Sequence, residues 1–376
     1  MHNFKLTKLL DKLFVLLVLL LLVVPLAKFN LDARSVEENR MLAKWPLWAD
    51  FHVLAGDNYF KALEGWFNDR FNQRDRLTKY AFNLDARINN THENDHALMG
   101  KENWIFTKER NSIGNFQNTS SLSDNEKEQL TATFSTINTW CLAHGIKLYI
   151  YIAPDKNQIY GEFYPDNIKK IGKENQADQI AACLRAIKIP VIYPRQELLA
   201  QKYRGLLYYK NDTHWSDLGA YYGYVALVNS LHKDFPDLQP VPASNLRLQN
   251  HVNQDKDLAR MLNMEVPEYD TLQYQVPSVI KSTAQVVEKV SGSDKAKIVA
   301  NPNGKHKIFF ISDSFTGAMR PFLNETFARV VYSGTDHLFA PEIPLIIKEK
   351  PEILVIECVG RYTNDLLLNQ PVKEGA

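Results

Sequence analysis

The chain has 376 residues, of which 45% are hydrophobic and 23% are charged, and its formal net charge is +1 at pH 7. This length allows one large domain or two smaller ones with an extensive core, and the near-neutral charge gives no reason to expect nucleic acid as a partner. The three cysteines, Cys141, Cys183 and Cys358, are far apart and lack CxxC spacing. This argues against a disulfide scaffold or a zinc knot and favours small buried hydrophobic residues.

The N-terminus has the pattern of a membrane anchor. Lys5, Lys8 and Lys12 precede an uncharged apolar run at 13–27, and a helix beginning slightly before that run reaches the roughly 17–25 residues that span a bilayer. The lysines favour a cytoplasmic N-terminus and an exported remainder. Small residues are poorly placed for signal-peptide cleavage here, so we expect residues 1–28 to remain as a signal anchor.

Residues 29–119 are predicted to form a juxtamembrane and helical N-terminal region. Apolar residues three or four positions apart, in one series from residue 60 to 71 and a second from residue 77 to 88, indicate one face of a helix. The sequence GKENWIF at 100–106 then predicts a turn that enters a short strand.

From about residue 120 the pattern alternates between helices and strands. Ser123 and Glu126 form a capping-box signature, and Gly145 is placed to end the helix that starts there. Strands separated by helices predict an α/β fold with a mostly parallel sheet flanked by helices. We expect strands at 146–153, 189–193, 206–210, 307–312, 329–333 and 352–358, and further helices at 175–187, 216–233, 315–327 and 341–349.

Residues 234–306 interrupt this alternation. They are rich in Pro, Asn, Gln and Lys and carry weak strand signals near 271–291, which favours a small β-rich insertion. The predicted catalytic domain therefore spans 120–366 with an insertion at 234–306, followed by a tail at 367–376.

Four polar clusters follow predicted strands, and they indicate a single site. In an open parallel sheet, ligands bind outside the carboxyl ends of the strands, so side chains that follow different strands can converge there. The clusters are Pro154 to Lys156, Asp212 to Trp215, Asp313 with Ser314, and Glu357 to Arg361.

Two of these clusters contain the residue types of a serine nucleophile site. Ser314 opens a predicted helix, so its N–H and that of Phe315 can face a developing oxyanion. A serine hydroxyl needs a base to become a nucleophile, and His214 can serve. Asp212, two residues earlier on the same side of an extended segment, can orient the imidazole.

Each of these features also has a purely structural interpretation. Ser-Asp-Ser before a helix is often an N-cap. Asp-x-His is often a hydrogen-bonded turn or half of a metal site, but a third ligand is missing at any recognisable spacing, so we expect no metal and no cofactor. Trp215 suits a packed aromatic or a sugar platform, and Lys156 and Arg361 suit paired charges or substrate contacts.

The motifs DTHW at 212–215 and SDSF at 312–315, in this order, resemble the alginate O-acetyltransferases of the AlgJ/AlgX type, which are SGNH-hydrolase-like. Two positions differ from the usual pattern, because Ser312 replaces a glycine and Gly360 stands where a second acid is common. Further matches are ENR at 38–40, GKENWIF at 100–106, APDKNQIY at 153–160, DLARML at 257–262 and IECVGRY at 356–362.

The resemblance implies a periplasmic enzyme, anchored in the bacterial inner membrane, that O-acetylates an alginate-like exopolysaccharide. It implies that Ser314 accepts the acetyl group, that His214 is the general base and that Asp212 orients it. It also implies a membrane-bound O-acyltransferase as the acetyl donor. Two alternatives remain open: an acetyl esterase with the same triad, and a non-catalytic polysaccharide-binding subunit of an export complex.

Overall fold

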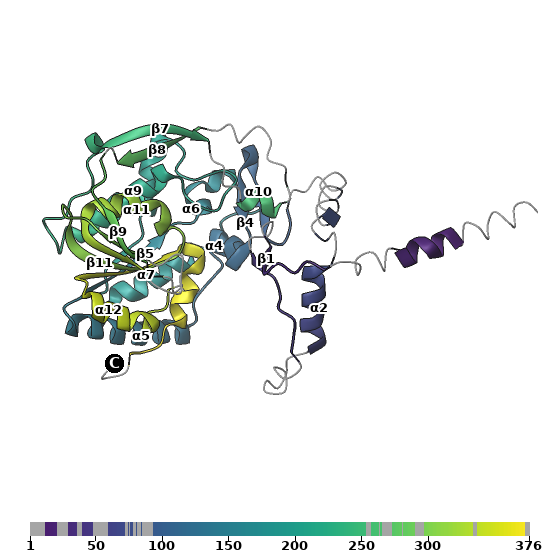
Figure 1. Cartoon of the computed structure of the whole chain (residues 1–376), viewed down its shortest axis with the longest axis horizontal. Coiled ribbons are helices and arrows are strands. Elements are labelled where there is room, and N and C mark those ends of the chain that lie inside the picture. The colour runs from purple at the N-terminus through teal and green to yellow at the C-terminus, as the bar shows by residue number, and fades with distance from the viewer. Residues whose placement is uncertain are drawn as a thin grey trace, which may run out of the picture. The chain divides into compact units, whose positions relative to one another are not determined.

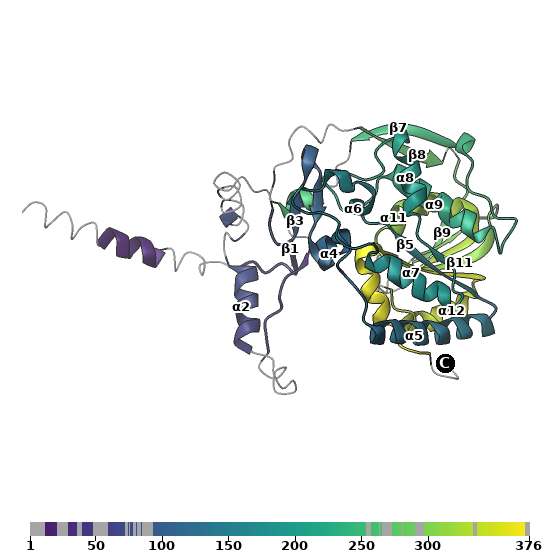
Figure 2. The same cartoon turned by 180° about the vertical axis from the view of Figure 1, so that it is seen from behind.

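The computed structural model (Figures 1 and 2) divides into two compact units, Met1–Asn94 with Asp257–Glu265, and Asp95–Lys256 with Val266–Ala376. Each unit is treated by itself below. The residues that the structure describes are 12–20, 29–35, 40–47, 59–71, 74, 76–77, 80, 84, 93–252, 257–262, 264, 273–279, 281–289, 297–333 and 337–372.

The smaller unit is organised around one buried arginine. Arg70, at the end of α2, is 8% exposed, and its guanidinium donates to the carbonyl oxygens of Asn30 and Ala43 at 2.9 and 3.0 Å. The helix expected from residue 60 is confirmed as α2, while most of its predicted continuation to residue 88 lies outside the described residues. The elements are β1 (Arg34–Ser35), β2 (Arg40–Met41), α2 (Tyr59–Arg70) and α10 (Asp257–Met261).

The predicted membrane anchor lies mostly outside the described residues, which include only 12–20 of the segment 1–28. Residues 12–20 are helical. Among the described residues, no helix combines the length and the apolar character needed to cross a bilayer.

The larger unit is built on a seven-stranded sheet with the order β6-β5-β13-β11-β12-β10-β9. The first five strands in this order run parallel, whereas β10 and β9 pair antiparallel at one edge. The sheet is therefore mixed with a parallel core. Its strands are β5 (Lys147–Ala153), β6 (Val191–Ile192), β9 (Gln285–Lys289), β10 (Lys297–Ala300), β11 (Lys305–Ile311), β12 (Phe327–Tyr332) and β13 (Ile353–Val359).

Helices cover both faces of this sheet (Figures 1 and 2). Successive strand residues point to opposite faces, so Ile150 packs with the helices on one side and Tyr151 with those on the other. Both cores are apolar, which explains the near-continuous hydrophobic strands. One face holds α5 (Asp124–Ala143), α7 (Gln176–Ala186) and α12 (Ile343–Glu349), and the other holds α8 (Arg195–Gln201), α9 (Asp217–Leu231) and α11 (Thr316–Thr326).

Local signals in the sequence set the ends of these helices. The predicted capping box is confirmed, because the Ser123 hydroxyl accepts from the Glu126 N–H and the Glu126 carboxylate accepts from the Ser123 N–H. Gly145 follows α5 with a φ of +71°, a left-handed conformation that glycine adopts without strain. Cys141 and Cys358 are buried free thiols, as expected, and Cys183 is partly buried.

One prediction in this unit is corrected. Residues 206–210 form no strand of the large sheet; Tyr208 instead makes an isolated antiparallel bridge to Trp215. The stretch 234–306, predicted as a β-rich insertion, carries the strands β7 to β10. Of these, β9 and β10 extend the large sheet, whereas β7 (Leu246–Val252) and β8 (Gln273–Val279) pair apart from it as a two-stranded sheet. A short hairpin of β3 (Ala97–Met99) and β4 (Ile105–Thr107) confirms the strand expected after the turn at residue 100.

Candidate active site

Ser314 lies in the turn between the carboxyl end of β11 and the start of α11. Its side chain is exposed. The helix starts at Thr316 with Phe315 at the N-cap position and no side-chain cap, so Ser314 does not serve as a capping residue. Ser312 needs no glycine-like backbone, since it is absent from the residues with positive φ. The turn therefore accepts a serine at 312 and leaves the hydroxyl of Ser314 open.

The structure brings together the three residues that the sequence suggested. His214 Nε2 lies 2.7 Å from Ser314 Oγ, and His214 Nδ1 lies 2.7 Å from Asp212 Oδ1. The same carboxylate oxygen accepts the backbone N–H of His214 at 2.9 Å. Because Nδ1–H donates to the carboxylate in the neutral tautomer, Nε2 is left to accept the serine proton.

Asp212 is held as an anion in a buried position. Burial would raise its pKa, but the hydrogen bond and charge of His214, aided by the Lys156 ammonium, lower the pKa to about 2. The residue is only 3% exposed. With this lowered pKa, the carboxylate stays ionised beside the imidazole at neutral pH.

Lys156 supports the loop that carries Asp212, and it is not among the residues that line the pocket of Ser314. It is 5% exposed, and its ammonium donates to the carbonyl oxygens of Tyr209 at 3.1 Å, Lys210 at 3.2 Å and Asp212 at 2.7 Å. The loop is also held by Tyr208, whose hydroxyl donates to the Pro154 carbonyl. The carboxyl end of β5 thus positions the histidine loop, in place of the strand end that was predicted there.

Trp215 and Phe315 join the two motifs, and the packed aromatic is the one of the two roles suggested for Trp215 that fits the structure. The indole of Trp215 is 1% exposed and donates through Nε1 to the Phe315 carbonyl at 3.1 Å, so it is a packed aromatic and not an accessible sugar platform. The Phe315 N–H donates to Asp313 Oδ1 at 2.8 Å and is therefore not free for an oxyanion.

Arg361 is a buried partner of Asp155. The guanidinium donates to Asp155 Oδ1 at 2.9 Å, and the two side chains are 7% and 6% exposed. A Cβ at position 360 would lie 2.7 Å from Asp155 Oδ2, so the glycine at this position leaves room for the ion pair. Arg361 therefore stabilises the junction of β5 and β13 and does not line the pocket of Ser314.

Asp313 and Glu357 fix the turn beneath the nucleophile. Asp313 Oδ2 accepts the N–H of Val359 at 2.8 Å, and Glu357 Oε2 accepts the N–H of Asp313 and the hydroxyl of Thr316. Burial and then the neighbouring Asp313 raise the pKa of Glu357 well above its usual range, which favours the neutral acid. For Asp313, the imidazole of His337 at 3.7 Å outweighs burial and lowers the pKa.

Ser314 opens into a pocket of about 470 Å³ whose charged residues, apart from Asp313, the sequence analysis missed. They come from separate parts of the chain and carry no shared motif, so their convergence becomes apparent only in the folded structure. The lining residues are Arg110, Ser312, Asp313, Ser314, Gly317, Arg320, Ser333, His337, Tyr362 and Asp365.

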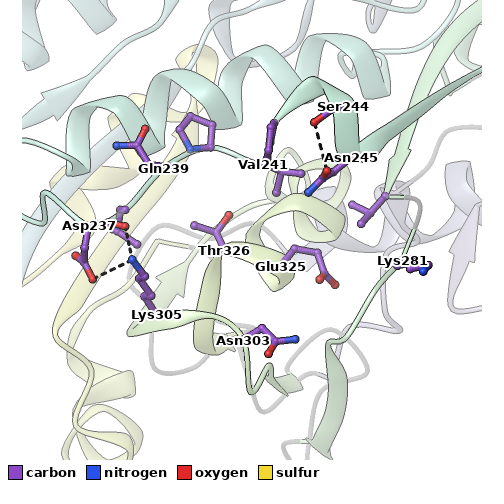
Figure 3. Close-up of a pocket in the computed structure, with 14 residues that line it drawn as sticks. Asp237, Gln239, Val241, Ser244, Asn245, Lys281, Asn303, Lys305, Glu325 and Thr326 are labelled. Carbon is purple, nitrogen blue, oxygen red and sulfur yellow. Dashed lines mark hydrogen bonds and ion pairs between the residues drawn. The ribbon is translucent and has the colours of Figure 1, made fainter.

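A second pocket, of about 560 Å³, lies at the amino end of β11, opposite the end that carries Ser314 (Figure 3). It is lined by Glu325 and Thr326 at the end of α11 and by Lys305 at the start of β11, about 20 Å along that strand from its carboxyl end. Figure 3 shows Lys305 bound to Asp237 there. None of the predicted site residues lines this pocket.

Comparisons with known proteins place the chain in a family. The family model described as "SGNH hydrolase-like domain, acetyltransferase AlgX" matches residues 97–337. The probable alginate O-acetylase AlgJ of Pseudomonas syringae pv. tomato is 27% identical over 174 residues, which are 46% of this chain and 42% of that protein. The chain thus matches less than half of the length of this curated relative.

Two solved structures share the fold. Bacillus cereus PatB1 with a sulfonyl adduct aligns with a TM-score of 0.54 at 13% identity, over 73% of this chain and 97% of that chain. A DHHW family protein from Eubacterium siraeum aligns with a TM-score of 0.50 at 16% identity, over 75% of this chain and 98% of that chain. The matched family model covers more than half of the sequence, and the chain therefore belongs to the SGNH hydrolase-like acetyltransferase family of AlgX.

Proposed function

We propose that this protein transfers acetyl groups to hydroxyls of an exported, alginate-like polysaccharide through an acetyl-Ser314 intermediate. The observation that carries the proposal is the continuous Ser314–His214–Asp212 chain, with 2.7 Å at both contacts. Family membership supports the reaction class, and the geometry supports the assignment of a role to each residue.

In the first step, Ser314 attacks the acetyl carbonyl of the donor. His214 Nε2 takes the hydroxyl proton as the bond from Oγ to the carbonyl carbon forms. When the tetrahedral intermediate collapses, the bond to the donor oxygen breaks and His214 returns its proton to that oxygen. Asp212 stabilises the imidazolium between these two transfers.

In the second step, a sugar hydroxyl takes the place of the donor oxygen. His214 accepts the proton of this hydroxyl, the sugar oxygen attacks the acetyl carbon, and Ser314 leaves and regains its proton. The oxyanion in both steps needs a donor. Within the part of the chain that the structure describes, the N–H of Ser314 has no hydrogen-bond acceptor. Of the two amides suggested from the sequence, we therefore assign the oxyanion to that of Ser314.

We place this reaction in the periplasm, with residues 1–28 as the inner-membrane anchor and a membrane-bound O-acyltransferase as the acetyl donor. The lysine-flanked apolar run at 13–27 supports this location. The protein should stay with membranes during alkaline carbonate extraction, and removing residues 1–28 should release it.

The central test is acetylation of Ser314. The protein is incubated with p-nitrophenyl acetate, and acetyl-serine is located by mass spectrometry after rapid acid quenching. We expect the mark on Ser314, its loss in Ser314→Ala, and no loss in Ser135→Ala, which changes an exposed serine on α5. A Ser314→Ala protein that still transfers acetyl to an oligosaccharide would refute the proposal.

The same reagents separate the alternatives. An esterase would release acetate from acetyl-Ser314 at a rate that an added oligosaccharide leaves unchanged, whereas a transferase would form acetylated saccharide. A non-catalytic binding subunit would fail to react with a fluorophosphonate at Ser314.

A further inference from the structure

The pocket of Ser314 contains charged residues that neutralise one another, with one exception. Arg110 pairs with Asp365 at 3.2 Å. Asp313 accepts two backbone N–H groups and lies 3.7 Å from the His337 ring. Among the residues that the structure describes, Arg320 is the pocket-lining cation for which no ion pair is found.

Arg320 lies on α11, one helical turn after Gly317, and both residues line the pocket. Its Nε is buried and has no hydrogen-bond partner, while its guanidinium carbon lies 4.6 Å from the centre of the Tyr332 ring. A buried, charged donor without an acceptor is unfavourable. An arginine in this state gains hydrogen bonds when a ligand supplies negatively charged oxygens, because the guanidinium edge matches them with parallel donors.

Lys297 adds positive charge beside this arginine. It is paired with Tyr332 in the β10–β12 register and makes no ion pair among the described residues. Burial, and then the nearby charge of Arg320, lower the pKa of Lys297, and burial lowers the pKa of Arg320. Two adjacent cations for which the described residues supply no anion produce a positive potential beside the Arg320 end of the pocket.

We infer that Arg320, aided by Lys297, binds a negatively charged oxygen group on the acceptor saccharide and so selects acidic acceptors. This inference rests on the proposed function. Arg320 follows Ser314 by six positions, which correspond to about 9 Å along a helix. The charge would therefore lie beyond the hydroxyl that is acetylated, on the same sugar or its neighbour, and would hold the chain while His214 accepts the proton.

Binding is measured without turnover, in the full chain carrying Ser314→Ala. Isothermal titration calorimetry compares a mannuronate oligosaccharide, the same oligosaccharide with its carboxylates reduced to alcohols, and a sulfated neutral oligosaccharide of equal length. Preference for the uronate alone identifies a carboxylate ligand, and equal preference for the sulfated form identifies a general anion subsite. Both results support the inference.

Replacement of Arg320 should remove this preference. We expect Arg320→Gln to weaken binding of the charged saccharides by about 10- to 100-fold and to leave the reduced form unaffected. Lys297→Gln should weaken binding of the charged saccharides by about 2- to 5-fold, mainly at low salt. Arg247→Gln makes the same charge change on the exposed strand β7 and should have no effect.

Arg320→Lys keeps the charge without the planar donors and should give an intermediate loss of binding to the charged saccharides. This variant keeps the test available if circular dichroism shows that Arg320→Gln is unfolded. Equal binding of the charged and reduced saccharides by the parent protein, or unchanged binding in Arg320→Gln and Arg320→Lys, would overturn the inference. The acetylation test is read separately. A protein that prefers charged saccharides, loses this preference in Arg320→Gln and yet never acetylates Ser314 would refute the proposed function and leave this subsite intact.

Discussion

Replacing Lys156 with methionine tests whether this lysine positions the histidine loop or contacts substrate. Methionine keeps an unbranched apolar stem beside the Trp104 and Phe106 rings, which lie 5.9 and 5.4 Å from the ammonium, and removes only the charged donor. The change therefore isolates the hydrogen bonds to the loop carbonyls.

The expected loss follows from these bonds. A hydrogen bond that involves a charged group contributes about 1.5–3 kcal/mol. The bond to the Asp212 carbonyl is buried and 2.7 Å long, whereas those to Tyr209 and Lys210 are partly buried and longer, at 3.1 and 3.2 Å. Allowing for the cost of burying the ammonium, we expect Lys156→Met to lower the free energy of unfolding by about 2–4 kcal/mol.

Urea unfolding followed by circular dichroism measures this loss, and the midpoint should fall by about 1 M. Because the loop also carries Asp212 and His214, Lys156→Met should lower the kcat of acetyl transfer by about 100-fold and leave the KM for the saccharide unchanged. Lys169→Met, at an exposed lysine, serves as the control. A Lys156→Met protein with the parent midpoint and a raised KM would show that the lysine contacts substrate and that this reasoning is wrong.

Three further changes test other parts of the site and fold. Asp212→Asn should reduce kcat by roughly 10³- to 10⁴-fold by favouring the wrong tautomer of His214; an activity within tenfold of the parent would contradict the triad. Trp215→Phe removes the donor to the Phe315 carbonyl and should cost about 1–2 kcal/mol of stability in urea unfolding; an unchanged midpoint would show that the bond does not stabilise the fold. Burial would lower the pKa of His306, but two hydrogen-bonded carboxylates outweigh it and raise this pKa above 6.5. His306 therefore stabilises the fold fully below that pH, and the advantage of the parent over His306→Asn should shrink as the pH rises from about 5.5 to 8.5; a difference in melting temperature that grows with pH would contradict this assignment.

Local sequence signals predicted much of the fold because their causes are local. The capping residues Ser123 and Glu126 contact each other within one turn, and Gly145 takes its conformation from its own missing side chain. The pairing of Asp212 with His214 was also predictable, since residues two apart in an extended segment lie on the same side. The contact between His214 and Ser314 could not be predicted from local spacing, because the two residues are a hundred positions apart. It was predicted from the order of the two motifs.

The sequence could not settle the role of a residue where distant groups decide it. Residues 206–210 have the composition of a strand, yet the bridge between Tyr208 and Trp215 draws them away from the sheet. A lysine and an arginine next to strand ends suited either paired charges or substrate contacts, and in the structure Lys156 is bound to loop carbonyls and Arg361 to a buried carboxylate. Neither partner can be assigned from the sequence around the charge, because each comes from another element.

Arg320 shows the reverse case, because its importance comes from having no ion-pair partner among the residues that the structure describes. In the sequence it is one of several basic residues on helices, and its spacing from Gly317 indicates only that both lie on the same face. Its significance depends on burial of Nε, on the stacking over Tyr332 and on Lys297 in the adjacent strand. Such a residue costs stability in the free protein, so if the acidic acceptors proposed above are its ligands, raising their concentration should raise the melting temperature of Ser314→Ala far more than that of the same protein with Arg320→Gln.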